Sequence, residues 1–80
     1  MTARIVSQKP AFLSELSLLP PKDVAIVVDK IHRLAVDPTP DGKVRKALPA
    51  KMYSGVCRLR CGDWRLLYTY DDSYVSLLSI

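Results

Sequence analysis

The stretch GVCRLRCGDWRLLYTY, residues 55–70, decides how this chain folds, because it reads as two β-strands joined by a tight turn. Gly62 and Asp63 form that turn, and a Gly-Asp loop between strands suits a type II′ hairpin in which the glycine supplies the positive φ angle. Such a turn sets the register of the whole hairpin. The predicted pairs are Cys61 with Trp64, Arg60 with Arg65, Leu59 with Leu66, Arg58 with Leu67, Cys57 with Tyr68 and Val56 with Thr69.

Residues that face each other across a hairpin point to the same side of the sheet, so this register predicts two different faces. One face is apolar and is expected to meet the helices: Cys57, Leu59, Cys61, Trp64, Leu66 and Tyr68. The other face gathers the arginines of the hairpin: Val56, Arg58, Arg60, Arg65, Leu67 and Thr69.

The predicted pair of Arg60 and Arg65 places like charges directly opposite each other, which costs a few tenths to about 1 kcal/mol unless an anion lies between them. Guanidinium groups suit phosphate, because they stay charged and donate two parallel hydrogen bonds. The alternative is a solvated face whose arginines pair with nearby aspartates, namely Asp63, Asp71 or Asp72.

Two helices are expected before the hairpin. Residues 4–6, RIV, can form a short opening strand, and Ser7 offers an N-cap side chain ahead of Pro10, which suits the first turn of a helix. Pro21 is well placed to start the next helix. From Val24 to Ala35 apolar residues recur at helical spacing, so the second helix is expected to run to Asp37 at the latest.

The order of these elements predicts an α+β fold in one domain over residues 1–80. A short N-terminal strand precedes an αα-hairpin, and the strand-like runs VCRLRC, WRLLYTY and YVSLLSI follow it. We expect the two helices to pack on one face of a three- to four-stranded antiparallel sheet.

The chain is basic, with 12 Lys and Arg against 8 Asp and Glu and a net charge of +4. This balance favours an anionic partner, either nucleic acid or an acidic protein segment. The run from Lys43 to Lys51 adds further cations to those of the hairpin. No apolar run approaches the roughly 20 residues that a membrane span requires, and the N-terminus lacks the apolar core of an export signal. We therefore expect a cytoplasmic protein with no membrane partner.

Three segments carry a resemblance to a known family: FLSELSLLP, IHRLAVDP and, most specifically, YSGVCRLRCGDWRLLYTYDD. With the apolar last strand, the chain resembles the RelE/ParE superfamily of toxins from bacterial type II toxin–antitoxin systems over essentially its whole length. The resemblance implies a microbial-RNase-like fold and, on the favoured RelE branch, a ribosome-dependent endonuclease that cleaves mRNA in the A site without a metal or other cofactor. It also implies a cognate antitoxin that wraps and neutralises the toxin, with a toxin–antitoxin hetero-oligomer as the expected assembly.

On the RelE branch the catalytic basic residues correspond to Arg58 and Arg65. Arg60 is expected to assist at the phosphate, and the other candidates for RNA or phosphate binding are Lys43, Arg45, Lys46, Lys51 and Tyr53. Tyr53 could stack on a base. The alternatives of other classes are a ParE-like inhibitor of DNA gyrase and an inactive remnant that only binds an antitoxin.

Two departures from the family pattern bear on activity. A basic position common on the RelE branch is Val56 here, and we expect the chain to be truncated at Ile80, before the family's C-terminal basic segment with its further catalytic arginine. Cleavage by the 2′-hydroxyl also needs proton transfer, and arginine is poorly suited to it because its pKa lies above about 12. We therefore expect a phosphate clamp that is impaired in catalysis.

The remaining residues with chemical potential have ordinary structural explanations. Cys57 and Cys61 lie four residues apart on one strand, which puts them at about 13 Å, too far for a disulfide, so they are expected to be reduced core thiols. His32 is expected at the surface of the second helix. Two cysteines and one histidine offer too few ligands for a metal site, so no metal is expected.

Overall fold

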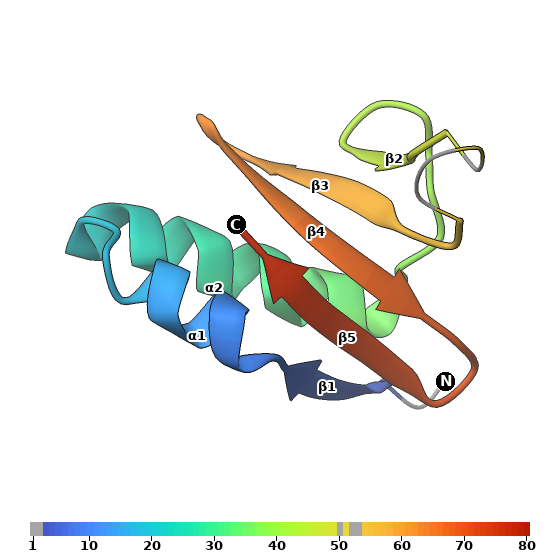
Figure 1. Ribbon diagram of the computed structural model, residues 1–80, viewed down its shortest axis with the longest axis horizontal. Coiled ribbons are helices and arrows are strands. Elements are labelled where there is room, and N and C mark those ends of the chain that lie inside the picture. Colours follow the sequence, from blue (N-terminus) through green and yellow to red (C-terminus); the bar gives the residue numbers. More distant parts are fainter. Residues whose placement is uncertain (1–2, 50, 52–53) are drawn as a thin grey trace.

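The computed structural model describes residues 3–49, 51 and 54–80, which form two helices and five strands (Figure 1). The elements in chain order are β1 (Ile5–Gln8), α1 (Pro10–Leu16), α2 (Pro21–Val36), β2 (Arg45–Ala47), β3 (Cys57–Cys61), β4 (Trp64–Tyr70) and β5 (Tyr74–Ser79). None of the helices in this part of the chain is long and apolar enough to span a membrane.

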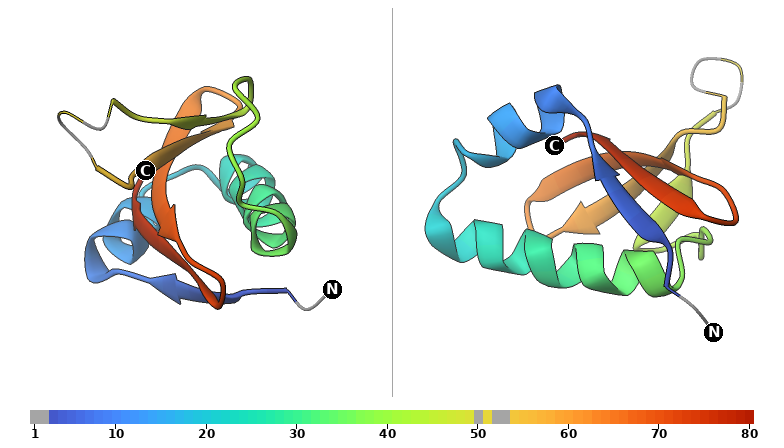
Figure 2. Two further views of the ribbon diagram at one scale, coloured as in Figure 1. Left: turned by 90° about the vertical axis from the view of Figure 1, so that its right-hand side faces the viewer. Right: turned by 90° about the horizontal axis from the view of Figure 1, so that it is seen from below.

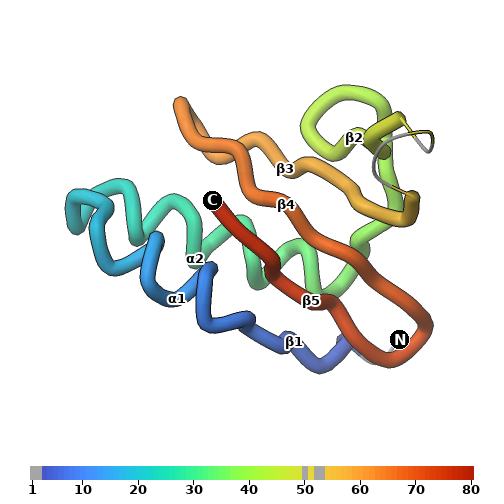
Figure 3. Tube along the Cα trace, in the orientation of Figure 1, coloured from blue at the N-terminus to red at the C-terminus, as the bar shows by residue number. Residues whose placement is uncertain are grey.

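The strands form one mixed sheet in the order β1-β5-β4-β3-β2. Strands β2 to β5 pair in antiparallel fashion, whereas β1 lies parallel to β5 at the edge and begins beside the β4–β5 turn (Figure 3). The predicted α+β class is confirmed, and the sheet has two features beyond the prediction: a parallel edge strand and the additional strand β2. The connection from β1 to β5 runs through both helices and three strands, so it is long enough for the crossover that a parallel pair requires.

The second helix has the predicted bounds. It starts at Pro21, whose missing N–H is harmless in a first turn, and it ends at Val36, one residue before Asp37. Its apolar stripe buries Val27, Ile31 and Leu34 against the sheet. In the right-hand view of Figure 2, α2 runs along the length of the molecule beneath the strands.

The first helix begins at Pro10 as predicted, but the prediction that Ser7 caps it is wrong. Ser7 pairs with Ser76 inside β1, and Lys9 holds the N-cap position without a side-chain hydrogen bond to the helix. The backbone N–H of Lys9 instead donates to the carbonyl of Leu77 at 3.0 Å, so the end of β1 stays attached to β5 until the helix starts. Pairing of β1 with the sheet therefore outcompetes the local cap.

One hydrophobic core joins both helices to a single face of the sheet, and α1 packs mainly on β5 while α2 contacts β3 and β5. Within this core the Tyr68 hydroxyl donates a 2.7 Å hydrogen bond to the carbonyl of Pro38, which satisfies its polar end. The core residues are Phe12, Leu19, Val27, Ile31, Leu34, Cys57, Leu59, Cys61, Leu66, Tyr68, Val75 and Leu77. Their position leaves the opposite face of the central strands without a helical cover.

Candidate phosphate-binding face

The β3–β4 hairpin has the predicted turn and register. Gly62 has a φ of 62°, and no described non-glycine residue has a positive φ, which fits a type II′ turn and excludes type I′. The ladder pairs Cys57 with Tyr68, Arg58 with Leu67, Leu59 with Leu66, Arg60 with Arg65 and Cys61 with Trp64. The predicted pair of Val56 with Thr69 lies outside the ladder, because β3 begins at Cys57.

Three arginines and one lysine share the sheet surface that is turned away from the helices. Arg60 and Arg65 are exposed and Arg58 is half-buried, while the residues that alternate with them on β3 are buried in the core. Strand β2 adds the lysine, because Lys46 lies directly opposite Arg58. We call Lys46, Arg58, Arg60 and Arg65 the arginine face.

The arginine face contains two cross-strand pairs of like charge: Lys46 with Arg58, and Arg60 with Arg65. The backbone N–H of Arg60 donates to the carbonyl of Val44 in a 2.9 Å bond, so Arg60 and Arg65 form a non-hydrogen-bonded pair, with Cα atoms about 4.5 Å apart. Each like-charged pair costs a few tenths to about 1 kcal/mol in the absence of an anion. The face thus keeps a repulsion that a bound polyanion would relieve.

No carboxylate within the described ranges forms an ion pair with the arginine face, since the ion pairs there involve only Arg33 and Arg45. The five residues outside those ranges include no Asp or Glu. Asp71, one of the predicted alternative partners, instead accepts hydrogen bonds from the backbone N–H groups of Ser73 and Tyr74. These cations are therefore available to an external anion.

Arg65 is held over the hairpin turn. Its Nη1 donates hydrogen bonds of 3.1 Å to the carbonyls of Gly62 and Trp64, which orients the guanidinium group and leaves the N–H groups of Nε and Nη2 for a ligand. An oriented guanidinium loses less freedom when it binds an oxyanion.

The arginine face can bind phosphate and stabilise negative charge, but proton transfer needs other groups. On the neighbouring strands, the cross-strand register places Leu67, Thr69, Ser76 and Ser79 on this surface with the four cations. None of these side chains titrates near neutral pH. The arrangement therefore suits a phosphate clamp rather than an acid–base pair.

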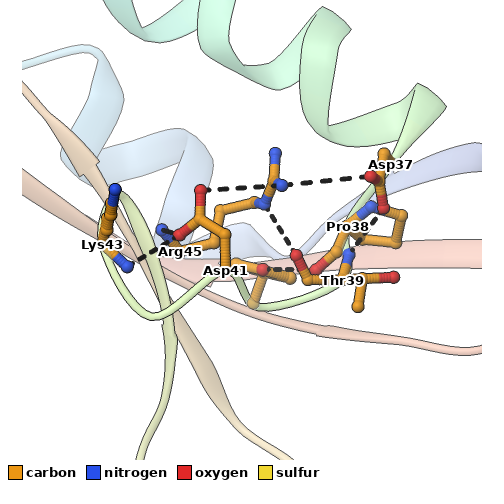
Figure 4. A network of polar contacts seen from close by, with 7 residues as sticks. Asp37, Pro38, Thr39, Asp41, Lys43 and Arg45 are labelled. Carbon is orange, nitrogen blue, oxygen red and sulfur yellow. Dashed lines mark hydrogen bonds and ion pairs between the residues drawn. The ribbon is translucent and has the colours of Figure 1, made fainter.

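Arg45, predicted to bind RNA, does not join the arginine face. It lies opposite Leu59, on the helix side of the sheet, because side chains alternate along β2. Its Nε donates to the carbonyl of Thr39 at 2.8 Å, and its Nη2 lies 3.9 Å from Asp37 and 3.7 Å from Asp41 (Figure 4). Arg45 thus holds the turn before β2 in place.

The aspartates of this turn are fixed by the backbone. Asp41 accepts hydrogen bonds from the N–H groups of Lys43 and Arg45 at 2.8 and 3.0 Å, and these bonds hold its pKa below the ordinary value. The backbone N–H of Thr39 donates a hydrogen bond to the carboxylate of Asp37 and likewise lowers its pKa. Both carboxylates are therefore ionised at neutral pH.

The other predicted RNA contacts lie apart from the arginine face. Lys43 is exposed in the turn before β2, and Lys51 is exposed in the segment between β2 and β3. Tyr53 lies outside the described residues. Of the predicted site residues, the structure brings together Lys46, Arg58, Arg60 and Arg65.

The cysteines and the histidine have the places predicted for them. Cys57 and Cys61 are free and buried, and burial raises the pKa of the Cys61 thiol to about 11. His32 is exposed on α2. No group of three or more potential metal-ligating His, Cys, Asp or Glu side chains occurs within residues 3–49, 51 and 54–80.

Comparison with known proteins shows which solved structures share this fold. No family model and no curated protein sequence matches the chain. Among solved structures, the toxin–antitoxin complex RelBE2 from Mycobacterium tuberculosis contains a chain with 30% sequence identity and a TM-score of 0.81, covering 98% of this chain and 95% of that one.

Two more distant structures share the fold. The archaeal RelE–RelB complex from Pyrococcus horikoshii has 21% identity and a TM-score of 0.77, over 98% of this chain and 92% of that one. The YoeB dimer from Staphylococcus aureus has 17% identity and a TM-score of 0.79, over 98% of this chain and 94% of that one. The 30% identity to the RelBE2 chain, over nearly the full length of both chains, shows that this chain belongs to the RelE family of toxins from toxin–antitoxin systems.

Proposed function

We propose that this toxin is a ribosome-dependent mRNA endonuclease that inhibits translation in the cytoplasm, and that a cognate antitoxin neutralises it. The observation that supports this proposal is the arginine face: four cations on one uncovered sheet surface, without a carboxylate partner among the described residues. A surface of this kind suits the phosphates of a nucleic acid, which bind Lys and Arg with release of counterions.

In the proposed reaction Arg58 and Arg65 contact the scissile phosphate, and Arg60 and Lys46 hold the adjoining backbone. Cleavage by the 2′-hydroxyl builds negative charge on the phosphate, and fixed guanidinium groups stabilise that charge. Lys43 and Lys51 extend the positive potential along the RNA. Because the described part of the face carries no His, Asp or Glu, we expect this chain to bind RNA more effectively than it cleaves it.

The antitoxin is proposed from the related complexes. RelBE2 and the archaeal RelE–RelB pair are both toxin–antitoxin complexes. We propose that this chain likewise forms a hetero-oligomer with its own antitoxin, and a basic toxin favours an acidic segment in that partner.

Ribosome-dependent cleavage tests the activity. Purified protein is added to programmed ribosomes with mRNA in the A site, and cleavage positions are mapped by primer extension. The double variant Arg58→Ala, Arg65→Ala should lose at least about a hundredfold in cleavage rate, because charge stabilisation of this kind contributes a factor of roughly 10² to 10³ per group. Arg33→Ala removes an arginine from α2, away from the face, and should leave the rate unchanged.

Equal cleavage by the double variant and the native protein would remove the proposed role of these arginines. Absence of cleavage by all forms, together with inhibition of gyrase supercoiling, would favour the ParE-like alternative. Inactivity in both assays with retained antitoxin binding would leave only a binding remnant.

A further inference from the structure

A second cationic site lies on the helix side of the sheet, behind the arginine face. A cavity of about 190 Å³ opens between α2, the turn before β2 and strand β3. This volume is several times the roughly 30 Å³ that one water molecule occupies in the liquid, so it admits a small polar group of a ligand. Lys30 and Arg33 of α2 line one side, and Asp41 and Arg45 line the other.

Two of these cations retain unused hydrogen-bonding capacity. Lys30 is half-buried and forms no ion pair with a carboxylate of the described residues. Arg45 has a side chain only 23% exposed, and its one hydrogen bond in the described part of the chain leaves from Nε. The Nη2 atom is 3.7 Å or more from the nearest carboxylates, which is longer than a hydrogen bond.

The neighbouring carboxylates engage part of this cationic lining. Asp41 and Asp37 accept backbone N–H groups at Oδ1 and direct Oδ2 toward Nη2 of Arg45, at 3.7 and 3.9 Å, while Asp29 pairs with the Nε of Arg33 at 3.2 Å. Among the described residues, Lys30 and the Nη1 of Arg45 have no carboxylate partner and serve as donors toward the cavity.

The lining of the cavity distinguishes between two kinds of anion. Leu34, Val44 and Leu59 supply an apolar floor beneath the cationic rim. An aspartate or glutamate side chain fits this combination, because its methylene groups can lie on the floor while its carboxylate meets Lys30 and Arg45. A backbone phosphate of RNA brings no comparable apolar stem.

We propose that this cavity, the acid-anchor pocket, binds the side chain of an acidic residue from a protein partner. The pocket lies on the opposite side of β2 from Lys46, so it can be filled while RNA occupies the arginine face. The identity of that partner as the antitoxin rests on the proposed function, whereas the preference of the pocket for a carboxylate does not.

Titration of the whole chain with small probes, followed by NMR, tests this proposal. The observed signals are the Arg45 Nε–H and the backbone amides of residues 41–45, with the Arg58 Nε–H as a reporter of the arginine face. The probes are N-acetyl-glutamate N-methylamide, the corresponding glutamine compound, inorganic phosphate and a short oligouridylate. The glutamate probe should give saturable shifts at the pocket in the millimolar range, and the glutamine probe should give none.

Variants on one helix supply the control. Lys30→Gln should weaken binding of the glutamate probe by about threefold or more, because a charge-assisted hydrogen bond is lost, and Lys22→Gln should leave it unchanged since Lys22 does not line the cavity. The amide spectrum of each variant shows whether it is folded.

Three results would overturn the proposal: no saturable shift with the glutamate probe, equal shifts with the glutamine probe, or stronger binding of phosphate or oligouridylate than of glutamate at the pocket. Failure of the oligouridylate to shift the Arg58 signal would count against the proposed RNA function alone. The two proposals are therefore tested separately.

Discussion

Reversal of one charge on the arginine face should stabilise the fold. Arg60 lies directly opposite Arg65, and Arg60→Glu turns a repulsive cross-strand pair into an attractive one. The like-charged pair costs a few tenths to about 1 kcal/mol, and an opposite-charge pair contributes about 0.2 to 1 kcal/mol. The free energy of unfolding should therefore rise by about 1 kcal/mol, which corresponds to an increase in Tm of about 4 to 8 °C for a domain of this size.

Urea and thermal unfolding at low ionic strength, in a buffer without phosphate or sulfate, measure this effect. Lys51→Glu is the matched control, because it changes the net charge by the same amount at an exposed position outside the sheet. The gain of Arg60→Glu should shrink in about 0.5 M salt, where the Debye length falls to a few ångströms. The same variant should bind RNA less tightly than the native protein.

A stability of Arg60→Glu no higher than that of Lys51→Glu at low ionic strength would refute the reasoning. It would mean that the two guanidinium groups avoid each other without cost, for example by extending into solvent. The arginine face would then carry no stored repulsion for an anion to relieve.

Three further predictions concern the core and the turn before β2. Tyr68→Phe removes the hydroxyl that donates to the buried carbonyl of Pro38, so urea unfolding should show a loss of about 1 to 3 kcal/mol, and an unchanged midpoint would contradict the role of that bond. Backbone hydrogen bonds lower the pKa of Asp41 in the folded protein. This shift stabilises the fold above the unfolded-state pKa, and the stabilisation is lost as the pH falls through the folded-state pKa. The urea midpoint of Asp41→Asn should therefore fall less than that of the native protein between about pH 5 and pH 2. Burial raises the pKa of Cys61 to about 11. A disulfide reagent at about pH 8 should therefore modify this thiol in the native protein far more slowly than in urea-unfolded protein. Equal rates would show that strand β3 opens readily.

Local patterns were enough to predict much of the site. The register of β3 and β4 follows from a turn of Gly62 and Asp63, and the separation of arginines from core residues follows from the alternation along each strand. The helix Pro21–Val36 follows from its apolar stripe and its flanking prolines. In each case the information lies within a few residues of the element that it determines.

The position of β2 could not be read in the same way. Arg45–Ala47 is a short strand whose basic residues carry no alternating apolar signal, and it exists because it pairs with β3, whose partner residues lie 10 to 14 positions away in the sequence. This pairing decides which side of the sheet each basic residue of β2 faces. It sends Lys46 to the arginine face and Arg45 to the helix side, although the two residues look equivalent in the sequence.

By itself the amino-acid sequence determined the class of fold, the hairpin and the gathering of Arg58, Arg60 and Arg65 on one surface, since turn chemistry and side-chain periodicity act over short distances. Only the tertiary structure decided that β1 lies parallel to β5, that Ser7 belongs to a strand, and that Lys46 rather than Arg45 completes the arginine face. These outcomes depend on contacts between distant segments, whose energies outweigh local preference once the core has formed.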